Sequence, residues 1–313
     1  MRIAITGALG FIGSNLVRCL ENHHDLVLFD IDNREQFHSH LWESDIDFVI
    51  HLGAITDTTI MDKELFDKWN LEYSKKIWDI CVEKQIPLIY ASSAATYGNG
   101  IKSPKRIIFS DNTPPSLLKP LNPYGESKND FDKYVIKKSK IIDPYCQLHT
   151  PPFWAGLKFF NVFGFGENRK GRMASVVFHA YNQIQQKGSM KLFKYGEQKR
   201  DFVYVDDVCD VIDWMLHKYN PYLEKSNDLT HIESGIYNVG SGKARTFYDL
   251  ASSVFKSMNI EKNIEYIDMP SDLIGIYQYY TEADILKLRQ GGYSKEFTTL
   301  EAGIQKYIQK LNS

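Results

Sequence analysis

The chain has 313 residues, of which 43% are apolar and 24% are charged, and its formal net charge is −2. This composition is that of a globular protein, and it excludes a disordered chain. A net charge near zero excludes a general electrostatic attraction to nucleic acid or membranes. No apolar run approaches the length of a membrane span, and the opening apolar stretch is too short for a signal peptide, so we expect a cytoplasmic protein.

The cysteines stand singly in the sequence, at Cys19, Cys81, Cys146 and Cys209. No CxxC pair and no histidine at a metal-binding spacing accompanies them. We therefore expect free thiols, with neither a disulfide framework nor a metal site.

Short β-rich runs alternate with helical stretches through the first half of the chain. Strands are expected at 3–6, 26–30, 48–53 and 88–92, with two more at 156–160 and 236–239. Helices are expected at 14–22, 34–43 and 63–84. This alternation predicts parallel strands with helices on both faces, which is a doubly wound α/β sheet of the Rossmann type.

The connection between the second and third expected strands is short. Only sixteen residues, Ile31–Ile46, separate them. A parallel crossover takes about a dozen residues, so this length holds one helix and no further strand. We therefore expect the sheet to be one edge strand short of the usual pattern.

The second half of the chain is less regular. Residues 99–123 are rich in Pro, Ser and Asn and predict a long loop. Three later pairs have the spacing of an N-terminal helix cap, which predicts three helices. The pairs are Thr246 with Asp249, Thr281 with Asp284, and Thr298 with Glu301.

The chain is expected to form two parts. Residues 1–163 and 200–262 would form a dinucleotide-binding domain of the Rossmann type. Residues 164–199 and 263–313 would form a smaller C-terminal α/β lobe that binds the substrate.

A glycine-rich turn with Gly7, Gly10 and Gly13 follows the first strand and opens the first helix. Glycine allows a tight turn and close approach of the backbone to a pyrophosphate, and the helix N-terminus supplies N–H groups. Asp30, at the end of the second strand, could accept hydrogen bonds from an adenosine ribose, which favours NAD. Arg34 could instead meet a 2′-phosphate, which favours NADP, so the sequence leaves both cofactors open.

A phenol and an ammonium stand four residues apart at Tyr124 and Lys128, on one face if Tyr124 opens a helix. A nearby cation lowers the pKa of tyrosine from about 10 toward that of a usable base. Ser93 ends an upstream strand, where its hydroxyl would reach the mouth of the site. A YxxxK pair alone also occurs on ordinary surface helices.

Together with Arg200–Asp207, these motifs resemble the extended short-chain dehydrogenase/reductases that act on nucleotide sugars. The resemblance implies a catalytic trio of Ser93, Tyr124 and Lys128. Dehydratases of this group carry an acid pair beside the catalytic hydroxyl, whereas Ala-Ala-Thr follows Ser93 here. Elimination chemistry is therefore disfavoured.

A more specific resemblance, to the ADP-L-glycero-D-manno-heptose 6-epimerases, rests on Phe160–Gly164 and Lys170–His179 and runs from about Gly7 to Leu311. It implies that Lys170 is a second acid/base, although such a loop lysine read alone would be a solvated side chain. The expected cofactor-binding residues are Gly7, Gly10, Phe11, Ile12, Gly13, Asp30, Arg34, Leu52, Gly53, Ala54, Asn70, Lys128 and Val162. The expected substrate-binding residues are Ser93, Asn161, Arg172, His179, Arg200 and Tyr277.

The resemblance implies oxidation of an ADP-heptose at carbon 6 and re-reduction on the other face, with NADP as cofactor and NAD as the alternative. Tyr124 and Lys170 would be the two acid/base groups of this step in lipopolysaccharide core biosynthesis. The resemblance also implies a homo-oligomer, with a pentamer as one form, and no nucleic-acid or membrane partner. An NAD(P)-dependent nucleotide-sugar reductase, a 4-epimerase, and a cofactor-sensing protein without turnover stay open as alternatives.

Overall fold

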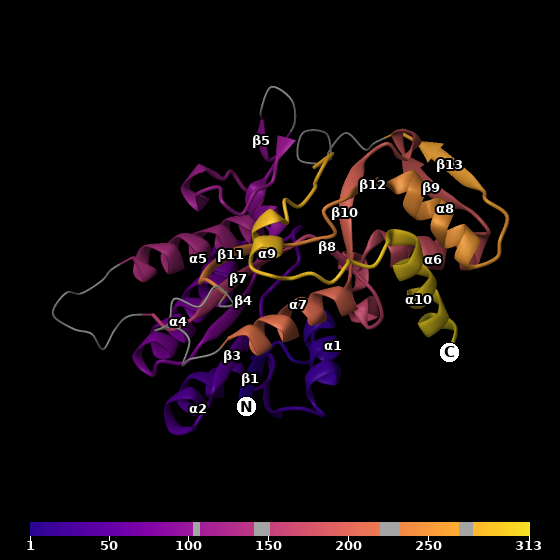
Figure 1. Cartoon of the computed structure of the whole chain (residues 1–313). Coiled ribbons are helices and arrows are strands. Elements are labelled where there is room, and N and C mark those ends of the chain that lie inside the picture. The colour runs from indigo at the N-terminus through magenta and orange to yellow at the C-terminus, as the bar shows by residue number, and fades with distance from the viewer. Residues whose placement is uncertain (103–106, 141–150, 220–231, 269–277) are drawn as a thin grey trace.

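A six-stranded parallel sheet forms the centre of the computed structural model, which describes residues 1–102, 107–140, 151–219, 232–268 and 278–313 (Figure 1). The order of the strands is β11-β7-β4-β3-β1-β2. Their bounds are β1 (Arg2–Thr6), β2 (Asp25–Phe29), β3 (Phe48–His51), β4 (Leu88–Ser93), β7 (Trp154–Phe159) and β11 (Gly235–Val239). The predicted doubly wound α/β sheet is confirmed.

Helices cover both faces of this sheet. On one face lie α1 (Phe11–Leu20) and α7 (Val205–Lys218), and on the other lie α2 (Phe37–Glu43), α4 (Tyr73–Glu83) and α5 (Pro123–Ser139). Side chains of β1 alternate between the faces, because Ile3 and Ile5 pack with α1 and α7 whereas Ala4 packs with the other helices. Burial of both faces explains why these strands are mostly apolar.

The strand β2 is one of the two edge strands of the sheet, and β11 is the other. Between β2 and β3 the chain forms only a short turn of 3₁₀ helix, η1 (Arg34–Gln36), followed by α2. All residues of this connection are described, and none of them adds a strand. The prediction that the sheet lacks one edge strand is therefore confirmed.

A second group of elements packs beside the sheet, on the right in Figure 1. Three strands pair in the order β12-β10-β8, and β13 pairs with β9. The strands are β8 (Asn161–Phe163), β9 (Met190–Phe193), β10 (Lys199–Tyr204), β12 (Ala244–Thr246) and β13 (Ile264–Ile267). The helices are α6 (Val176–Lys187), α8 (Phe247–Ser257) and α10 (Leu300–Asn312), with the turns η6 (Glu167–Met173) and η7 (Lys194–Gly196). The division of the chain between two domains stays a prediction.

Two long segments differ from expectation. The predicted single helix over residues 63–84 is divided into α3 (Lys63–Phe66), the π-helical turn η2 (Asp67–Glu72) and α4. The predicted loop at 99–123 contains a short antiparallel pair, β5 (Ile101–Lys102) with β6 (Ile107–Ile108), and the turn η4 (Pro115–Leu117). A third difference is that α1 begins at Phe11 rather than Ser14, so that the glycine turn itself caps the helix.

The first of the three predicted helix caps is confirmed, and the second is wrong. At the start of α8, Thr246 and Asp249 form a reciprocal capping box. No helix begins at Thr281, whose hydroxyl instead accepts a hydrogen bond from the backbone N–H of Asp201 at 3.2 Å. The helix in this region is α9 (Leu286–Gln290).

The third predicted cap is displaced by one residue. The cap of α10 is Thr299, whose hydroxyl accepts from the N–H of Ala302 at 3.2 Å. Thr298 is not available for that role, because its hydroxyl donates to the buried carboxylate of Asp207 at 2.8 Å. A tertiary contact therefore decides which threonine caps the helix.

Three of the four cysteines lie in the described part of the chain. Cys19, Cys81 and Cys209 are free thiols, and Cys146 lies outside the described residues. None of the helices within the described ranges is both long enough and apolar enough to cross a bilayer.

Candidate active site

A cavity of about 740 Å³ lies at the carboxyl ends of the parallel strands and is also lined by residues of η6. Its walls come from the turns that follow β1, β2, β3 and β4, and from β7 and β8. Open parallel sheets bind ligands at this edge, because the loops that leave neighbouring strands diverge there. The predicted cofactor residues that line the cavity are Gly7, Gly10, Phe11, Ile12, Gly13, Asp30, Arg34, Leu52, Gly53, Ala54, Lys128 and Val162.

The glycine turn forms one wall of the cavity at close backbone contact. Gly7 has φ +70°, and a Cβ atom on it would lie 2.6 Å from the backbone N of Gly53. A Cβ atom on Gly13 would lie 2.0 Å from the carbonyl oxygen of Gly7. Side chains at these positions would push the turn away from α1 and from the loop after β3, so the cradle requires glycine.

Asp30 and Arg34 lie at the β2 end of the cavity. The carboxylate of Asp30 accepts hydrogen bonds from the N–H groups of Leu9 and Ile31, each at 2.8 Å, and so holds the glycine turn. The guanidinium carbon of Arg34 lies 3.2 Å from the centre of the Trp69 ring. This cation–π contact orients Arg34 at the cavity edge.

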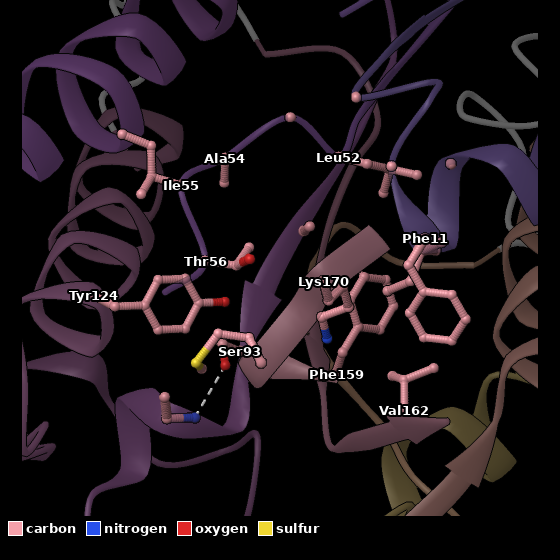
Figure 2. Close-up of a pocket in the computed structure, with 18 of the residues that line it drawn as sticks. Phe11, Leu52, Ala54, Ile55, Thr56, Ser93, Tyr124, Phe159, Val162 and Lys170 are labelled. Carbon is pink, nitrogen blue, oxygen red and sulfur yellow. Dashed lines mark hydrogen bonds between the residues drawn. The ribbon is translucent and has the colours of Figure 1, made fainter. Parts of the chain in front are cut away.

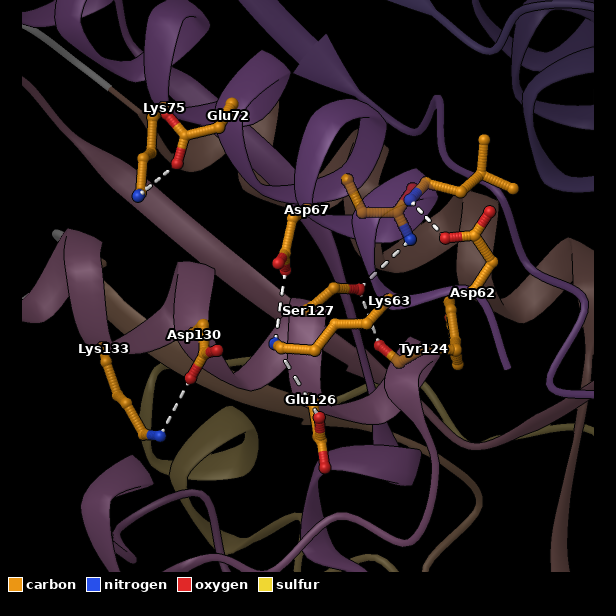
Figure 3. A network of polar contacts seen from close by, with 12 residues as sticks. Asp62, Lys63, Asp67, Glu72, Lys75, Tyr124, Glu126, Ser127, Asp130 and Lys133 are labelled. Atoms are coloured by element: carbon orange, nitrogen blue, oxygen red, sulfur yellow. Dashed lines mark hydrogen bonds and ion pairs between the residues drawn. The ribbon is translucent and has the colours of Figure 1, made fainter. Parts of the chain in front are cut away.

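Asn70 does not line the cavity, although we expected it to bind the cofactor. It is fully buried, and its side-chain amide bonds both the N–H (2.8 Å) and the carbonyl (2.9 Å) of Ile55. It also donates to Ser127 Oγ at 3.2 Å, and Ser127 donates to the Tyr124 carbonyl at 2.8 Å (Figure 3). Asn70 therefore holds the loop after β3 against α5 from behind the wall.

His51, at the end of β3, extends this buried network. Its ring hydrogen-bonds Thr6 Oγ1 at 2.6 Å through Nδ1 and Ser74 Oγ at 2.8 Å through Nε2. Because Ser74 already donates its proton to the Asn70 carbonyl at 2.6 Å, it must accept from Nε2–H, which leaves Nδ1 to accept from Thr6. Burial lowers the pKa of His51 to about 3, so the ring is neutral.

Ser93 and Tyr124 meet inside the cavity from two different elements (Figure 2). Ser93 ends β4, and its Oγ accepts from the N–H of Ala95 at 3.1 Å. Tyr124 lies in the first turn of α5, which Asn122 caps by accepting from the N–H of Gly125 at 2.8 Å. Burial raises the pKa of Tyr124, and the neighbouring Ser93 hydroxyl lowers it in part.

Lys128 follows Tyr124 on α5, and its Nζ donates to the Ala91 carbonyl at 2.9 Å. Burial lowers the pKa of Lys128 to about 8, against the opposing effect of Asp132. We expected this ammonium to lower the pKa of Tyr124. Burial of the phenol is the largest effect on Tyr124 and raises its pKa, and the lowering by Lys128 stays a prediction.

Lys170 lies on η6 and lines the same cavity as Tyr124. In Figure 2 the two side chains lie on opposite sides of Ser93. The Lys170 side chain is half-buried, and its Nζ lies 5.5 Å from the centre of the Phe11 ring. Burial lowers the pKa of this ammonium, and the nearby carboxylate of Glu167 raises it. A lysine in such a place can exchange a proton closer to neutral pH than a solvated one.

Residues 3–240 match the sequence profile of the NAD dependent epimerase/dehydratase family. A protein of Fusobacterium nucleatum named ADP-L-glycero-D-manno-heptose-6-epimerase is 45% identical over 280 residues, which cover 84% of this chain and 76% of that protein. One of the same name from Nitratidesulfovibrio vulgaris is 39% identical over 340 aligned positions, covering 98% and 96%. The chain belongs to this epimerase family.

The solved structures agree with this membership. The crystal structure of the ADP-L-glycero-D-manno-heptose-6-epimerase of Helicobacter pylori matches with a TM-score of 0.78 at 27% identity, over 100% of this chain and 96% of that one. A UDP-glucose 4-epimerase of Thermus thermophilus, solved with NAD, matches with a TM-score of 0.76 at 20% identity, over 100% and 99%. The second likeness concerns the fold alone. The resemblance to heptose 6-epimerases is confirmed as a family relationship.

Arg172 does not line the cavity, although the family resemblance implied a substrate contact. Its side chain is 68% exposed, and Nη2 lies 2.8 Å from Asp57 Oδ2, on the loop after β3. His179 also lies outside the cavity lining, where its Nε2 hydrogen-bonds the Arg172 carbonyl at 3.2 Å. These side chains therefore contact protein groups rather than the cavity.

The other predicted substrate residues have separate positions. Ser93 and Asn161 line the cavity, and Asn161 Nδ2 also donates to the Asp201 carbonyl at 3.2 Å. Arg200 is buried but does not line it. Tyr277 lies outside the described residues.

Several lining residues were not predicted from the sequence. They are Thr6, Thr56, Thr58, Trp69, Met173, Ser175 and Gln278, among others. Thr56 and Thr58 could have been found, since they follow the end of β3, where parallel strands place ligand-binding loops. Trp69 comes from the π-helical turn η2, which shifts side chains away from ordinary helical positions. No group of three or more His, Cys, Asp or Glu side chains within the described ranges could hold a metal ion.

Proposed function

We propose that this protein interconverts the two carbon-6 epimers of an ADP-activated heptose, converting ADP-D-glycero-D-manno-heptose to its L-glycero form. The reaction would proceed by oxidation at carbon 6 and re-reduction on the opposite face. The single observation that carries the proposal is that Tyr124 and Lys170, from two different elements, line one cavity on opposite sides of Ser93. Two acid/base groups on opposite sides of the reacting carbon suit an inversion that uses one bound cofactor, because the carbonyl intermediate can turn and be protonated from the other side.

The cavity fits a nicotinamide dinucleotide. The cradle at Gly7 and Gly13 has no room for a Cβ atom, and it begins a helix whose N–H groups suit a pyrophosphate. Lys128, which also lines the cavity, would hold the ribose next to the nicotinamide. When bound, the dinucleotide would accept a hydride from the substrate and return it.

Proton transfer would belong to the chain's own residues. Ser93 would orient the substrate hydroxyl by hydrogen bonding, and Tyr124 would exchange the proton of that hydroxyl on one face. Lys170 would exchange it on the other face, which its lowered pKa favours. In Figure 2 Ser93 lies between Tyr124 and Lys170, and carbon 6 of the substrate would lie among these three side chains.

The proposed cofactor is NADP rather than NAD. Arg34 lines the β2 end of the cavity, and its cation–π contact with Trp69 holds the guanidinium there. A guanidinium suits a phosphomonoester, which only NADP carries on its adenosine ribose. Asp30 is already occupied by the N–H groups of Leu9 and Ile31, which leaves less of its carboxylate for a ribose.

The test is the Lys170→Met variant, in two assays. Conversion of one ADP-heptose epimer to the other should be lost, whereas slow dismutation of an aldehyde analogue, which uses one face, should persist. Lys187→Met, at an exposed position at the end of α6, is the matched control and should leave both assays unchanged.

If the Lys170→Met variant epimerises the substrate at the normal rate, Lys170 is not the second acid/base. Stoichiometric consumption of reduced cofactor by the wild-type enzyme would instead support the nucleotide-sugar reductase, because an epimerase regenerates its cofactor in every turnover. A homo-oligomer, with a pentamer as the expected form, is also proposed, and sedimentation of the purified protein would test it.

A further inference from the structure

A buried ion pair lies behind the wall that carries Ser93 and Tyr124. Lys158 Nζ on β7 lies 3.0 Å from Asp132 Oδ2 on α5, and the two side chains are 1% and 0% exposed. Neither side chain lines the cavity. Burying two charges is costly unless each is fully hydrogen-bonded, so the contacts of the pair indicate what it does.

Asp132 joins α5 to the end of β4. Its Oδ1 accepts from the Tyr90 hydroxyl at 3.0 Å, and its Oδ2 accepts from the Ser92 hydroxyl at 2.8 Å. One helical turn earlier, Lys128 donates to the Ala91 carbonyl at 2.9 Å. The helix that carries Tyr124 is thus tied to three consecutive residues of β4, directly before Ser93.

Lys158 contacts the turn that begins at Ser93. Its Nζ donates to Thr96 Oγ1 at 2.6 Å and lies 4.7 Å from the centre of the Tyr97 ring. Thr96 Oγ1 in turn donates to the Ser93 carbonyl at 2.8 Å. Thr96 and Tyr97 belong to η3 (Ala94–Tyr97), the short turn that Ser93 caps. Lys158 therefore fixes the turn that begins at Ser93.

We propose that Asp132 and Lys158 are positioning residues that fix the Ser93 and Tyr124 hydroxyls relative to each other in the cavity. The two hydroxyls come from β4 and α5, and this ion pair contacts both elements. The pair acts through Ser92 and Thr96, since it does not itself reach the cavity. A displacement of about 1 Å at a reacting group can cost on the order of 100-fold in rate. This role rests on the proposed function.

The test uses graded variants in the full-length protein. Thr96→Val keeps the volume and the ion pair but removes the hydrogen bonds from Lys158 and to Ser93. It should lower kcat on the order of tenfold, with little change in KM or in the Kd for the cofactor. Lys158→Met should lower kcat further, and Lys158→Arg, which keeps the charge and its donors, should recover most of the loss.

Asp207→Asn is the matched control, because Asp207 is also a buried carboxylate, with hydrogen bonds from the Thr298 N–H and hydroxyl, both at 2.8 Å. It does not line the cavity, so it should lower the Tm and leave kcat of the folded enzyme unchanged. If Thr96→Val and Lys158→Met lose activity only in proportion to lost folded protein, the positioning role is overturned. If Lys158→Met fails to fold, the kcat of Thr96→Val tests the positioning role by itself.

The crystal structure of Thr96→Val separates failure of this inference from failure of the proposed function. The two hydroxyls should move apart in the variant. If they do so while the wild-type protein shows no epimerase activity, the positioning role holds and the proposed function fails. If they stay in place, the positioning role fails whatever the activity is.

Discussion

Arg172 and Asp57 form an ion pair, with 2.8 Å between Nη2 and Oδ2, that joins η6 to the loop after β3. Both segments contribute residues to the cavity, so the pair links two of its walls. Hydrogen bonds from Thr59 and Arg172 hold the pKa of Asp57 down at about 2, which keeps the carboxylate charged at neutral pH. Arg169 adds a second link, because it donates to the Leu9 carbonyl at 3.3 Å.

Breaking this ion pair should loosen η6 over the cavity. We expect Arg172→Gln and Asp57→Asn each to speed cofactor release by a few-fold, a small effect because exposed ion pairs are weak. The double variant should release cofactor no faster than either single variant, and the effect should disappear in high salt. Stopped-flow measurement of cofactor release checks this, with Arg245→Gln, from the exposed Arg245–Glu301 pair, as the control. Additive effects of the two substitutions would contradict the link.

Tyr124→Phe should keep the fold and cofactor binding while lowering turnover by about 10² to 10⁴-fold, the usual contribution of a general acid/base. The ring and its edge contact with Phe66 remain, and only the hydroxyl that meets Ser93 is lost. Circular dichroism, a cofactor titration and kcat measure the three quantities. A rate within a few-fold of the wild type would exclude Tyr124 from proton transfer.

Arg34→Ala should weaken NADP binding far more than NAD binding, because only NADP has a 2′-phosphate to lose from the guanidinium. Trp69→Leu should have a smaller effect of the same kind, since it removes the ring on which Arg34 is stacked. Calorimetric titration of both dinucleotides measures the ratio. An equal loss of affinity for both cofactors would indicate that Asp30 binds the adenosine ribose and that NAD is the native ligand.

The buried His51 should make stability fall with acid. Its pKa is about 3 in the folded protein and near 6.5 in the unfolded chain, so the unfolded chain binds the extra proton between these values. The contribution of neutral His51 is complete above about pH 6.5 and decreases by up to about 1.4 kcal/mol per pH unit as the pH falls toward 3. Urea unfolding of the wild type and of His51→Gln, compared from pH 7 to pH 4.5, tests this. The stability difference should narrow as the pH falls, and a constant difference would contradict it.

Local spacing in the sequence was sufficient for much of the fold and for part of the site. The glycine turn, the Tyr124–Lys128 pair and the short connection between β2 and β3 each depend on residues close together in the chain. Periodicity, backbone conformation and crossover length act over such distances, and they led to the six-stranded sheet with β2 at its edge.

Only the tertiary structure decided which distant side chains meet. Arg172 pairs with Asp57, Asn70 lies behind the cavity wall, Trp69 stacks on Arg34, and Thr298 is drawn from its expected cap by Asp207. In each case the partner lies on another element, or a π-helical turn changes the direction of the side chain. The sequence by itself determined the strands of the central sheet and the chemistry of its motifs. Packing decided the direction and partner of each side chain, because these depend on how elements far apart in the chain are brought together.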